Sequence, residues 1–169
     1  MDYVSGLIHK HASKGVVVDT NLLLVFLIGA YDTAYLEHFK KTSSYTAEDY
    51  ELLRRIVKNF PNVVVTPNIL TEVSNLTLDY MTEGHHSKYF PHLISYINGA
   101  AEQHTKMEVL IKNGMLIKFG FTDTSILETA QANDYLVITD DLKLYAMLQR
   151  YGVGSININH LRTSRLLSS

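Results

Sequence analysis

Short runs of apolar, mostly β-branched residues alternate along this chain with longer stretches in which apolar residues recur at helical spacing. The first run is Val16–Val18, and comparable runs occupy residues 63–65, 115–118, 135–138 and 155–158. A strand that is buried on both faces, as in a parallel sheet, needs no polar alternation. Strands that alternate with helices are typical of right-handed βαβ units. The pattern therefore predicts an α/β fold with three layers, in which a central parallel sheet of four to five strands has helices on both faces.

The stretches between these runs predict the helices, whose starts are marked by capping acids, hydroxyl residues and proline. The expected helices cover residues 21–30, 32 to about 40, a segment opened by Thr46 and Asp49, a segment opened by Pro67, residues 93–112, a segment opened by Asp123, and residues 141–150. Residues 79–91 lack helical periodicity and contain Gly84 and Pro91, so we expect a loop there, a candidate lid. Its histidines, His85 and His86, either touch a ligand or, in the favoured interpretation, are solvated.

The length of 169 residues suits one domain, here residues 1–169, with a polar leader over residues 1–14 and a polar tail over residues 159–169. The leader is either a short helix packed on the edge of the sheet or a mobile segment. It holds His9 and His11, whose side chains would point apart in a helix. We therefore expect both histidines on the surface rather than in a metal site.

The composition narrows the class of protein. The chain has no cysteine, which excludes disulfides and thiolate zinc sites and fits a cytoplasmic location, our expectation for this protein. The leader has an acid at position 2 and no long apolar core, so we expect no secretory signal. The longest apolar run, Leu22–Ile28, is too short to cross a bilayer, and we expect no association with membranes. A net charge of −2 argues against a generic polyanion-binding surface, but not against an enzyme whose acids share one pocket.

Acidic residues occur at equivalent places after the predicted strands. Asp19 ends the first strand, Glu72 lies early in the helix after the second, Asp123 opens a later helix, and Asp140 with Asp141 follows the strand at 135–138. In a parallel sheet these places share the carboxyl edge, where open α/β sheets bind their ligands. Each aspartate taken alone is also a good helix cap. The joint pattern at several junctions favours a site at which the acids converge.

Converging carboxylates repel one another, and a divalent cation removes this conflict. Ligands that are all oxygen select a hard ion, so the sequence predicts Mg²⁺ or Mn²⁺ as the cofactor. Such an ion neutralises phosphate oxygens and activates water, which suits the hydrolysis of a phosphodiester.

Four motifs together resemble those of the PIN-domain nucleases. They are Val18-Asp19-Thr20-Asn21, Thr71-Glu72-Val73, Thr122-Asp123-Thr124 and Val137-Ile138-Thr139-Asp140-Asp141, and the resemblance extends over about residues 16–158. It implies a PIN-like fold and metal-binding, catalytic roles for Asp19, Glu72, Asp123 and Asp141, with Asp140 as an additional candidate ligand. It also implies that Thr20 or Asn21 steadies Asp19, and that Thr139 orients Asp141. The leader and the long segment from Asp32 to Pro61 depart from the small bacterial members of the family.

The resemblance implies a Mg²⁺- or Mn²⁺-dependent ribonuclease, and more specifically an endonuclease. It also implies candidate partners besides RNA, namely an antitoxin or another protein that restrains a toxin of this type, and a second copy in a homodimer. The alternative is a non-catalytic PIN-like module that binds RNA or a protein. No acid follows Asp141, whereas Lys143, Arg150, Arg162 and Arg165 are basic. These four residues form either a phosphate-facing rim or a mildly basic surface helix and tail.

Overall fold

The structure, a computed structural model, describes the backbone of residues 3–166 and the side chains of residues 3–163. Its strands are β1 (Val16–Val18), β2 (Val63–Val65), β3 (Ala101–Glu102), β4 (Leu136–Thr139) and β5 (Ser155–Asn157). The helices are α1 (Tyr3–His11), α2 (Thr20–Tyr31), η1 (Thr33–Tyr35), α3 (Ala47–Val57), α4 (Pro67–Tyr80), α5 (Glu83–Ile97), α6 (Met107–Leu110), α7 (Leu116–Asn133), α8 (Leu142–Arg150) and α9 (Ile158–Leu166). The predicted α/β class is confirmed.

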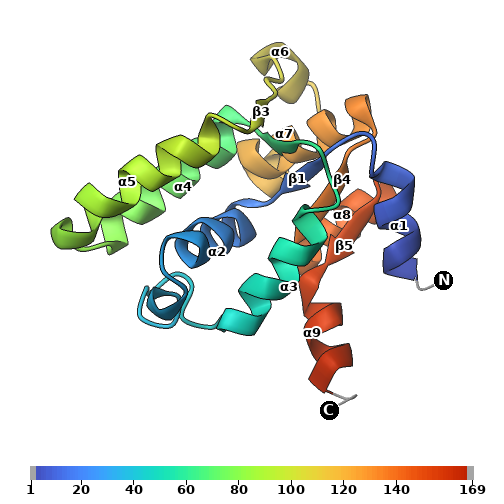
Figure 1. The fold of residues 1–169 in the computed structure, drawn as a ribbon. Helices are drawn as coiled ribbons and strands as arrows, with labels where there is room; N and C mark the ends of the chain where they lie inside the picture. Colours follow the sequence, from blue (N-terminus) through green and yellow to red (C-terminus); the bar gives the residue numbers. More distant parts are fainter. Residues whose placement is uncertain (1–2, 167–169) are drawn as a thin grey trace.

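The five strands form one parallel sheet in the order β3-β2-β1-β4-β5 (Figure 1). The central strand β1 pairs with both neighbours, and Val17 lies opposite Val64 on one side and Val137 on the other. Every residue of β1 and β4 is buried. Burial on both faces explains why these runs are apolar without alternation.

Helices cover both faces of the sheet, which gives the expected three layers. The chain moves one way along the sheet from β1 to β3 and the other way from β4 to β5, so right-handed crossovers place the connecting helices on opposite faces. Helix α2 contacts α3, α4 and α5, and α7 contacts α8. Figure 1 shows α1 and α8 on the side of the sheet opposite to α2 and α3. Contact on several sides explains why α2 is apolar all round.

Several local predictions are confirmed by hydrogen bonds. The Thr46 hydroxyl accepts from the Asp49 amide, and the Asp49 carboxylate accepts from the Thr46 amide, which makes a complete capping box for α3. Pro67 opens α4 at its first position, where a missing N–H leaves no partner unsatisfied. Helices α2 and α8 begin and end within a residue or so of their predicted bounds.

The predicted loop over residues 79–91 is wrong, because α5 begins at Glu83 and continues through Pro91. Gly84 is in the first turn of α5, and both Pro91 and Ser87, whose carbonyl Pro91 cannot bond, are exposed residues. Tyr89 and Leu93, one turn apart, bury one face of the helix. The favoured interpretation of His85 as a solvated loop residue is also wrong, since its ring stacks on Tyr35 with the centroids 4.1 Å apart.

Two further elements differ from prediction. The helix expected over residues 93–112 ends at Ile97, and strand β3 and helix α6 follow it. The strand expected over residues 115–118 is instead the start of α7, which is interrupted at Gly120 with φ 78°. Ile117 in this segment is 97% exposed, unlike the residues of a buried central strand, and the segment is not part of the sheet. The helix expected from Asp32 to about Lys40 is reduced to the short η1, which Asp32 caps.

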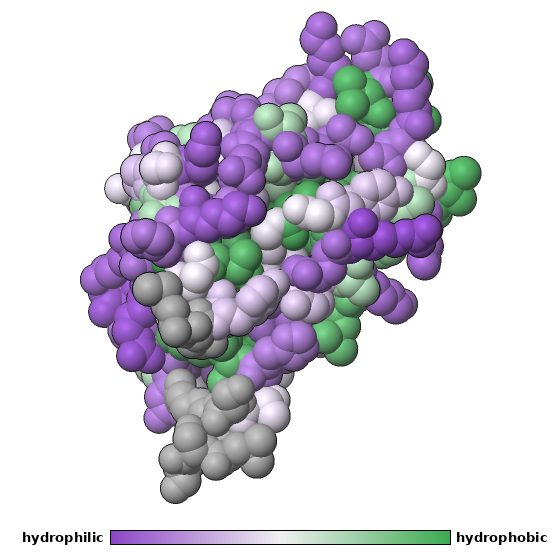
Figure 2. Space-filling model, turned by 90° about the vertical axis from the view of Figure 1, so that its right-hand side faces the viewer, coloured by the Kyte–Doolittle hydropathy of each residue, from purple (hydrophilic) through white to green (hydrophobic). Residues whose placement is uncertain are grey.

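The two ends of the described chain are helical. The leader is a helix, as the first of its two alternatives has it, but α1 contacts β4, an inner strand, rather than the edge of the sheet. His11 is buried rather than on the surface, and its Nδ1 lies 2.8 Å from the Asp134 carbonyl oxygen. The tail, for which the sequence predicted only a polar character, forms α9 as far as Leu166. The face shown in Figure 2 is mostly hydrophilic, with hydrophobic residues in separate patches. Within residues 3–166, no helix is both long and apolar enough to span a bilayer.

Candidate functional site

The predicted site acids follow neighbouring strands at the carboxyl edge of the sheet. Asp19 directly follows β1, and Asp140 and Asp141 directly follow β4, the strand that pairs with β1. Glu72 is on α4, which follows β2, and Asp123 is on α7 just after the interruption at Gly120. We refer to these five carboxylates as the acidic edge.

Asp19 is held in place by its local sequence and by β4. Its Oδ1 accepts the amide N–H of Leu22 at 3.0 Å, as expected for the N-cap of α2. Its Oδ2 accepts the Thr139 hydroxyl and the Asp140 amide, the latter at 3.3 Å. The side chain is buried, and burial raises the pKa of Asp19 to about 7, with the nearby Asp140 carboxylate as the next cause.

Asp140 lies beside Asp19 and is held by side chains from three elements. Its Oδ2 accepts the hydroxyl of Tyr45, and its Oδ1 lies 3.5 Å from the Asn21 amide nitrogen. Its backbone carbonyl accepts the side-chain amide of Asn159 at 2.8 Å. Burial raises the pKa of Tyr45, and its hydrogen bond to Asp140 raises it further, so the hydroxyl stays protonated and donates.

Glu72 joins three helices at the same edge. One carboxylate oxygen accepts the Thr20 hydroxyl of α2 at 2.8 Å, and the other accepts the Thr122 hydroxyl of α7 at 2.6 Å. Although Glu72 is exposed, these two bonds restrict its rotamer and direct it toward α7. The hydroxyls of Thr20 and Thr122 therefore position an acid that belongs to a different helix.

Asp123 and Asp141 form the second half of the acidic edge. Burial raises the pKa of Asp123 to about 6, and the carboxylates of Asp141 and Glu72 are the next causes, in that order. No hydrogen bond or ion pair from residues 3–163 holds the Asp123 carboxylate. Asp141 caps α8, because one of its oxygens accepts the amides of Lys143 and Leu144 at 2.5 and 3.1 Å. Its other oxygen accepts no hydrogen bond from residues 3–163.

A groove of about 640 Å³ runs between α7 and α8 and is lined by Asp123 and Asp141. Three cations line the same groove, namely Lys118, Lys143 and Arg150. The predicted basic rim is therefore divided: Lys143 and Arg150 share the groove with two acids, whereas Arg162 is bound to Asp49 with Nη2 3.0 Å from Oδ2. The backbone of Arg165 is in α9, but its side chain lies outside the described residues. We call this depression the α7–α8 groove.

The supporting residues are at the predicted place, but two of them have different partners. Thr139 accepts the Asp141 amide at 2.9 Å, next to the acid it was expected to orient, and it also donates to Asp19, a partner the sequence did not predict. Thr20 bonds Glu72 instead of steadying Asp19, and Asn21 approaches Asp140.

Other residues at this edge carry no signal in the sequence. Tyr45 is in a turn before α3, and nothing near it in the chain indicates that it bonds an acid 95 residues away. Asn159 and Thr122 likewise find their partners only in the folded chain. Lys118 precedes the interruption at Gly120, and its basic charge is the one local indication of its place in the groove.

The ligands that the acidic edge can offer to a metal ion are carboxylate oxygens. Hard divalent cations prefer oxygen ligands, so the chemistry of these side chains fits a hard cation. The acids are arranged as a pair, Asp19 with Asp140, and a group around Asp123. In the part of the chain that the structure describes, no three acid or histidine side chains are grouped closely enough to hold a metal ion as they stand. The predicted metal site stays a prediction.

No protein-family model matches this chain, and no curated protein matches its sequence at a significant level. Its function is therefore inferred from the geometry of the acidic edge.

Proposed function

We propose that this protein is a Mg²⁺- or Mn²⁺-dependent nuclease that hydrolyses phosphodiester bonds, with RNA as its substrate. One observation carries the proposal. Within residues 3–163, none of the five carboxylates of the acidic edge forms an ion pair with a basic side chain, and burial followed by neighbouring acids raises the pKa of Asp19 and Asp123. Acids left in this state favour a bound divalent cation, which would remove their repulsion.

Different residues of the acidic edge and of the α7–α8 groove would have different roles in this reaction. Asp123 and one oxygen of Asp141 accept no hydrogen bond from residues 3–163 and would hold the cation together with Glu72, with Asp19 and Asp140 behind them. When bound, the cation would neutralise phosphate charge and activate a water for hydrolysis. Thr20 and Thr122 fix the rotamer of Glu72. The basic side chains of the α7–α8 groove lie beside Asp123 and Asp141. There they would contact the phosphates that flank the scissile bond.

A cleavage assay with labelled RNAs and DNAs tests this proposal in the presence of Mg²⁺, Mn²⁺ or a chelator. We expect metal-dependent cleavage of RNA, with internal products if the enzyme is an endonuclease. Asp19→Asn should reduce that cleavage at least about tenfold, because even the outer partners of a metal site account for effects of about 10–100-fold. Asp79→Asn, an exposed acid on α4 with no site contact, is the matched control and should retain wild-type activity. Equal activity in wild type and Asp19→Asn would refute the assignment.

A second function, binding of RNA or a protein without cleavage, is favoured by the observation that no three acids of the described chain form a ready metal group. Thermal melting separates the two functions, since a ligand that binds only the native state raises the midpoint. A midpoint raised by millimolar Mn²⁺ in wild type but not in Asp19→Asn supports the nuclease. An unchanged midpoint together with RNA binding in the absence of cleavage supports the second function.

A further inference from the structure

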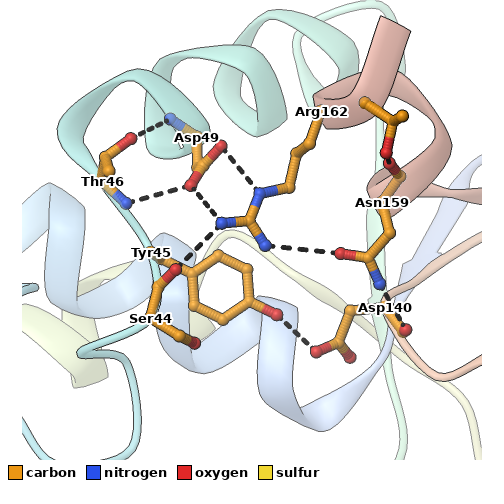
Figure 3. A network of polar contacts seen from close by, with 8 residues as sticks. Ser44, Tyr45, Thr46, Asp49, Asp140, Asn159 and Arg162 are labelled. Atoms are coloured by element: carbon orange, nitrogen blue, oxygen red, sulfur yellow. Dashed lines mark hydrogen bonds and ion pairs between the residues drawn. The ribbon is translucent and has the colours of Figure 1, made fainter. Parts of the chain in front are cut away.

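A polar network joins the C-terminal helix α9 to the acidic edge (Figure 3). At its centre is Arg162, whose Nε and Nη2 contact the two carboxylate oxygens of Asp49 at 3.1 and 3.0 Å. Nη2 also donates to the carbonyl oxygen of Ser44 at 2.9 Å, and Nη1 donates to the side-chain oxygen of Asn159 at 3.4 Å. The planar guanidinium thus uses its fork to bind one buried carboxylate and two neighbours.

Both ends of Asp140 are held by residues that Arg162 touches. The guanidinium carbon lies 4.9 Å from the ring centroid of Tyr45, and the hydroxyl of that ring donates to the Asp140 carboxylate. Asn159, which accepts from Arg162, donates to the Asp140 carbonyl at 2.8 Å. Figure 3 shows the Tyr45 ring between the guanidinium and Asp140. The side chain and the backbone of this acid are therefore fixed through one arginine.

This arrangement does more than brace the turn before α3. Phenylalanine would fill the same buried space as Tyr45, so the packing does not require a hydroxyl. The hydroxyl is directed at a partly exposed acid that sits next to Asp19 and donates its own N–H to it. After burial, the Asp140 charge is the largest cause of the raised pKa of Asp19, so the Tyr45 hydroxyl and the Asn159 amide hold in place an acid that repels its neighbour when both are ionised.

We propose that Tyr45 and Arg162 are positioning residues for the acidic edge, which hold Asp140 beside Asp19 so that a divalent cation can be bound. This inference rests on the proposed function. It gives α9 a role in the site, because the helix supplies both Arg162 and Asn159.

The test uses the intact chain with Tyr45→Phe, which removes only the hydroxyl, and Arg162→Lys, which keeps the charge but loses the fork. Tyr89→Phe is the control for the first variant, since Tyr89 is a buried tyrosine on α5 that contacts none of the five acids. Arg54→Lys is the control for the second, since Arg54 forms an exposed ion pair with Glu51. The readouts are the Mn²⁺ dissociation constant, kcat and KM for RNA cleavage, and the amide NMR resonance of Asp140.

We expect Tyr45→Phe to raise the Mn²⁺ dissociation constant about tenfold and to lower kcat at saturating RNA, with KM unchanged. Arg162→Lys should act in the same direction. The double variant should be no more impaired than the more impaired of the two single variants, because both substitutions act through one network. The Asp140 amide resonance should shift in both variants without metal, and in neither control. Melting curves without metal verify that all four variants are folded.

The outcomes separate this inference from the proposed function. If the wild type binds Mn²⁺ and Tyr45→Phe has the same affinity and kcat as the wild type, the inference is overturned and the nuclease assignment stands. An unshifted Asp140 amide in Tyr45→Phe would overturn it whatever the metal does. A wild-type protein that neither binds Mn²⁺ nor cleaves RNA would overturn both.

Discussion

The Asp19 side chain is buried, caps α2 and lies beside a second carboxylate, that of Asp140. It accepts hydrogen bonds from Leu22, Thr139 and Asp140, and each of these favours the ionised form. Burial and the Asp140 charge oppose them and prevail, so the pKa of Asp19 is raised to about 7. The residue therefore changes its protonation in the range in which enzymes commonly work, and the stability of the fold has to depend on it.

The sign of that dependence follows from linkage. Between about pH 4 and pH 7 the folded chain keeps a proton on Asp19 that the unfolded chain releases, so the free energy of unfolding falls as the pH rises. Without divalent ions, we expect a lower melting midpoint at pH 8 than at pH 5. The fall in the free energy of unfolding that Asp19 causes is at most about 4 kcal/mol. This corresponds to a pKa difference of about 3 between the folded and the unfolded chain, at about 1.36 kcal/mol for each pKa unit. Calorimetry across this pH range measures it.

Asp19→Asn isolates the effect, because asparagine does not titrate and still offers an oxygen to the Leu22 amide. The pH dependence of its midpoint should be flatter than that of wild type, whereas Asp79→Asn should follow wild type. If Asp19→Asn keeps the full slope, Asp19 does not titrate in this range.

At the scale of elements, the contact between α2 and α3 depends on a glycine. A Cβ at Gly29 would lie 2.4 Å from Cδ2 of Tyr50, closer than any real carbon contact. Tyr50 is buried on α3 and packs against the ring of Phe26 at 6.0 Å between centroids. The glycine thus allows two helices that follow one another in the chain to approach closely on one face of the sheet.

Gly29→Ala should therefore destabilise the fold by about 1–3 kcal/mol, although alanine is the better helix former, because overpacking outweighs helix propensity here. Gly6→Ala in the middle of α1 is the control, since nothing lies within 4 Å of the added carbon. It should stabilise the protein by about 0.5–1 kcal/mol. Urea denaturation of both variants measures the difference. A neutral Gly29→Ala would mean that α3 moves away without loss.

At the scale of the whole molecule, basic side chains lie toward both edges of the sheet. The α7–α8 groove brings three cations beside two acids at the carboxyl edge. Lys58 is exposed at the end of α3, just before β2 begins, and so lies toward the opposite edge. This contrast provides a test of where the nucleic acid binds.

Lys118→Ala and Lys143→Ala should each raise KM for RNA several-fold and leave kcat largely intact, because the lysines contact flanking phosphates rather than the reacting atoms. Each should also reduce the slope of log affinity against log salt by about 1. Lys58→Ala should change neither quantity. RNA binding measured over a range of salt concentrations gives these slopes, and an equal loss in Lys58→Ala would place the substrate elsewhere.

The sequence by itself determined the class of the fold and most of its strands. The Val16–Val18, Val63–Val65 and Leu136–Thr139 strands are predictable because full burial on both faces requires apolar, mostly β-branched residues in short runs. Caps such as Thr46 are local, since donor and acceptor lie within three residues. The place of the acids after the strands follows from the same reasoning, because in a parallel sheet all strands end at one edge.

Only the tertiary structure decided the features that depend on distant partners. Strand β3 has two residues, and it is a strand only because it pairs with β2. Helix α5 forms through Gly84 and Pro91 because burial of Tyr89 and Leu93 outweighs local propensity. His11 is buried because it fits against Gly154 and the Asp134 carbonyl. The link from Arg162 to Asp49 spans 113 residues, and no local pattern reports an ion pair that forms only when the chain is folded.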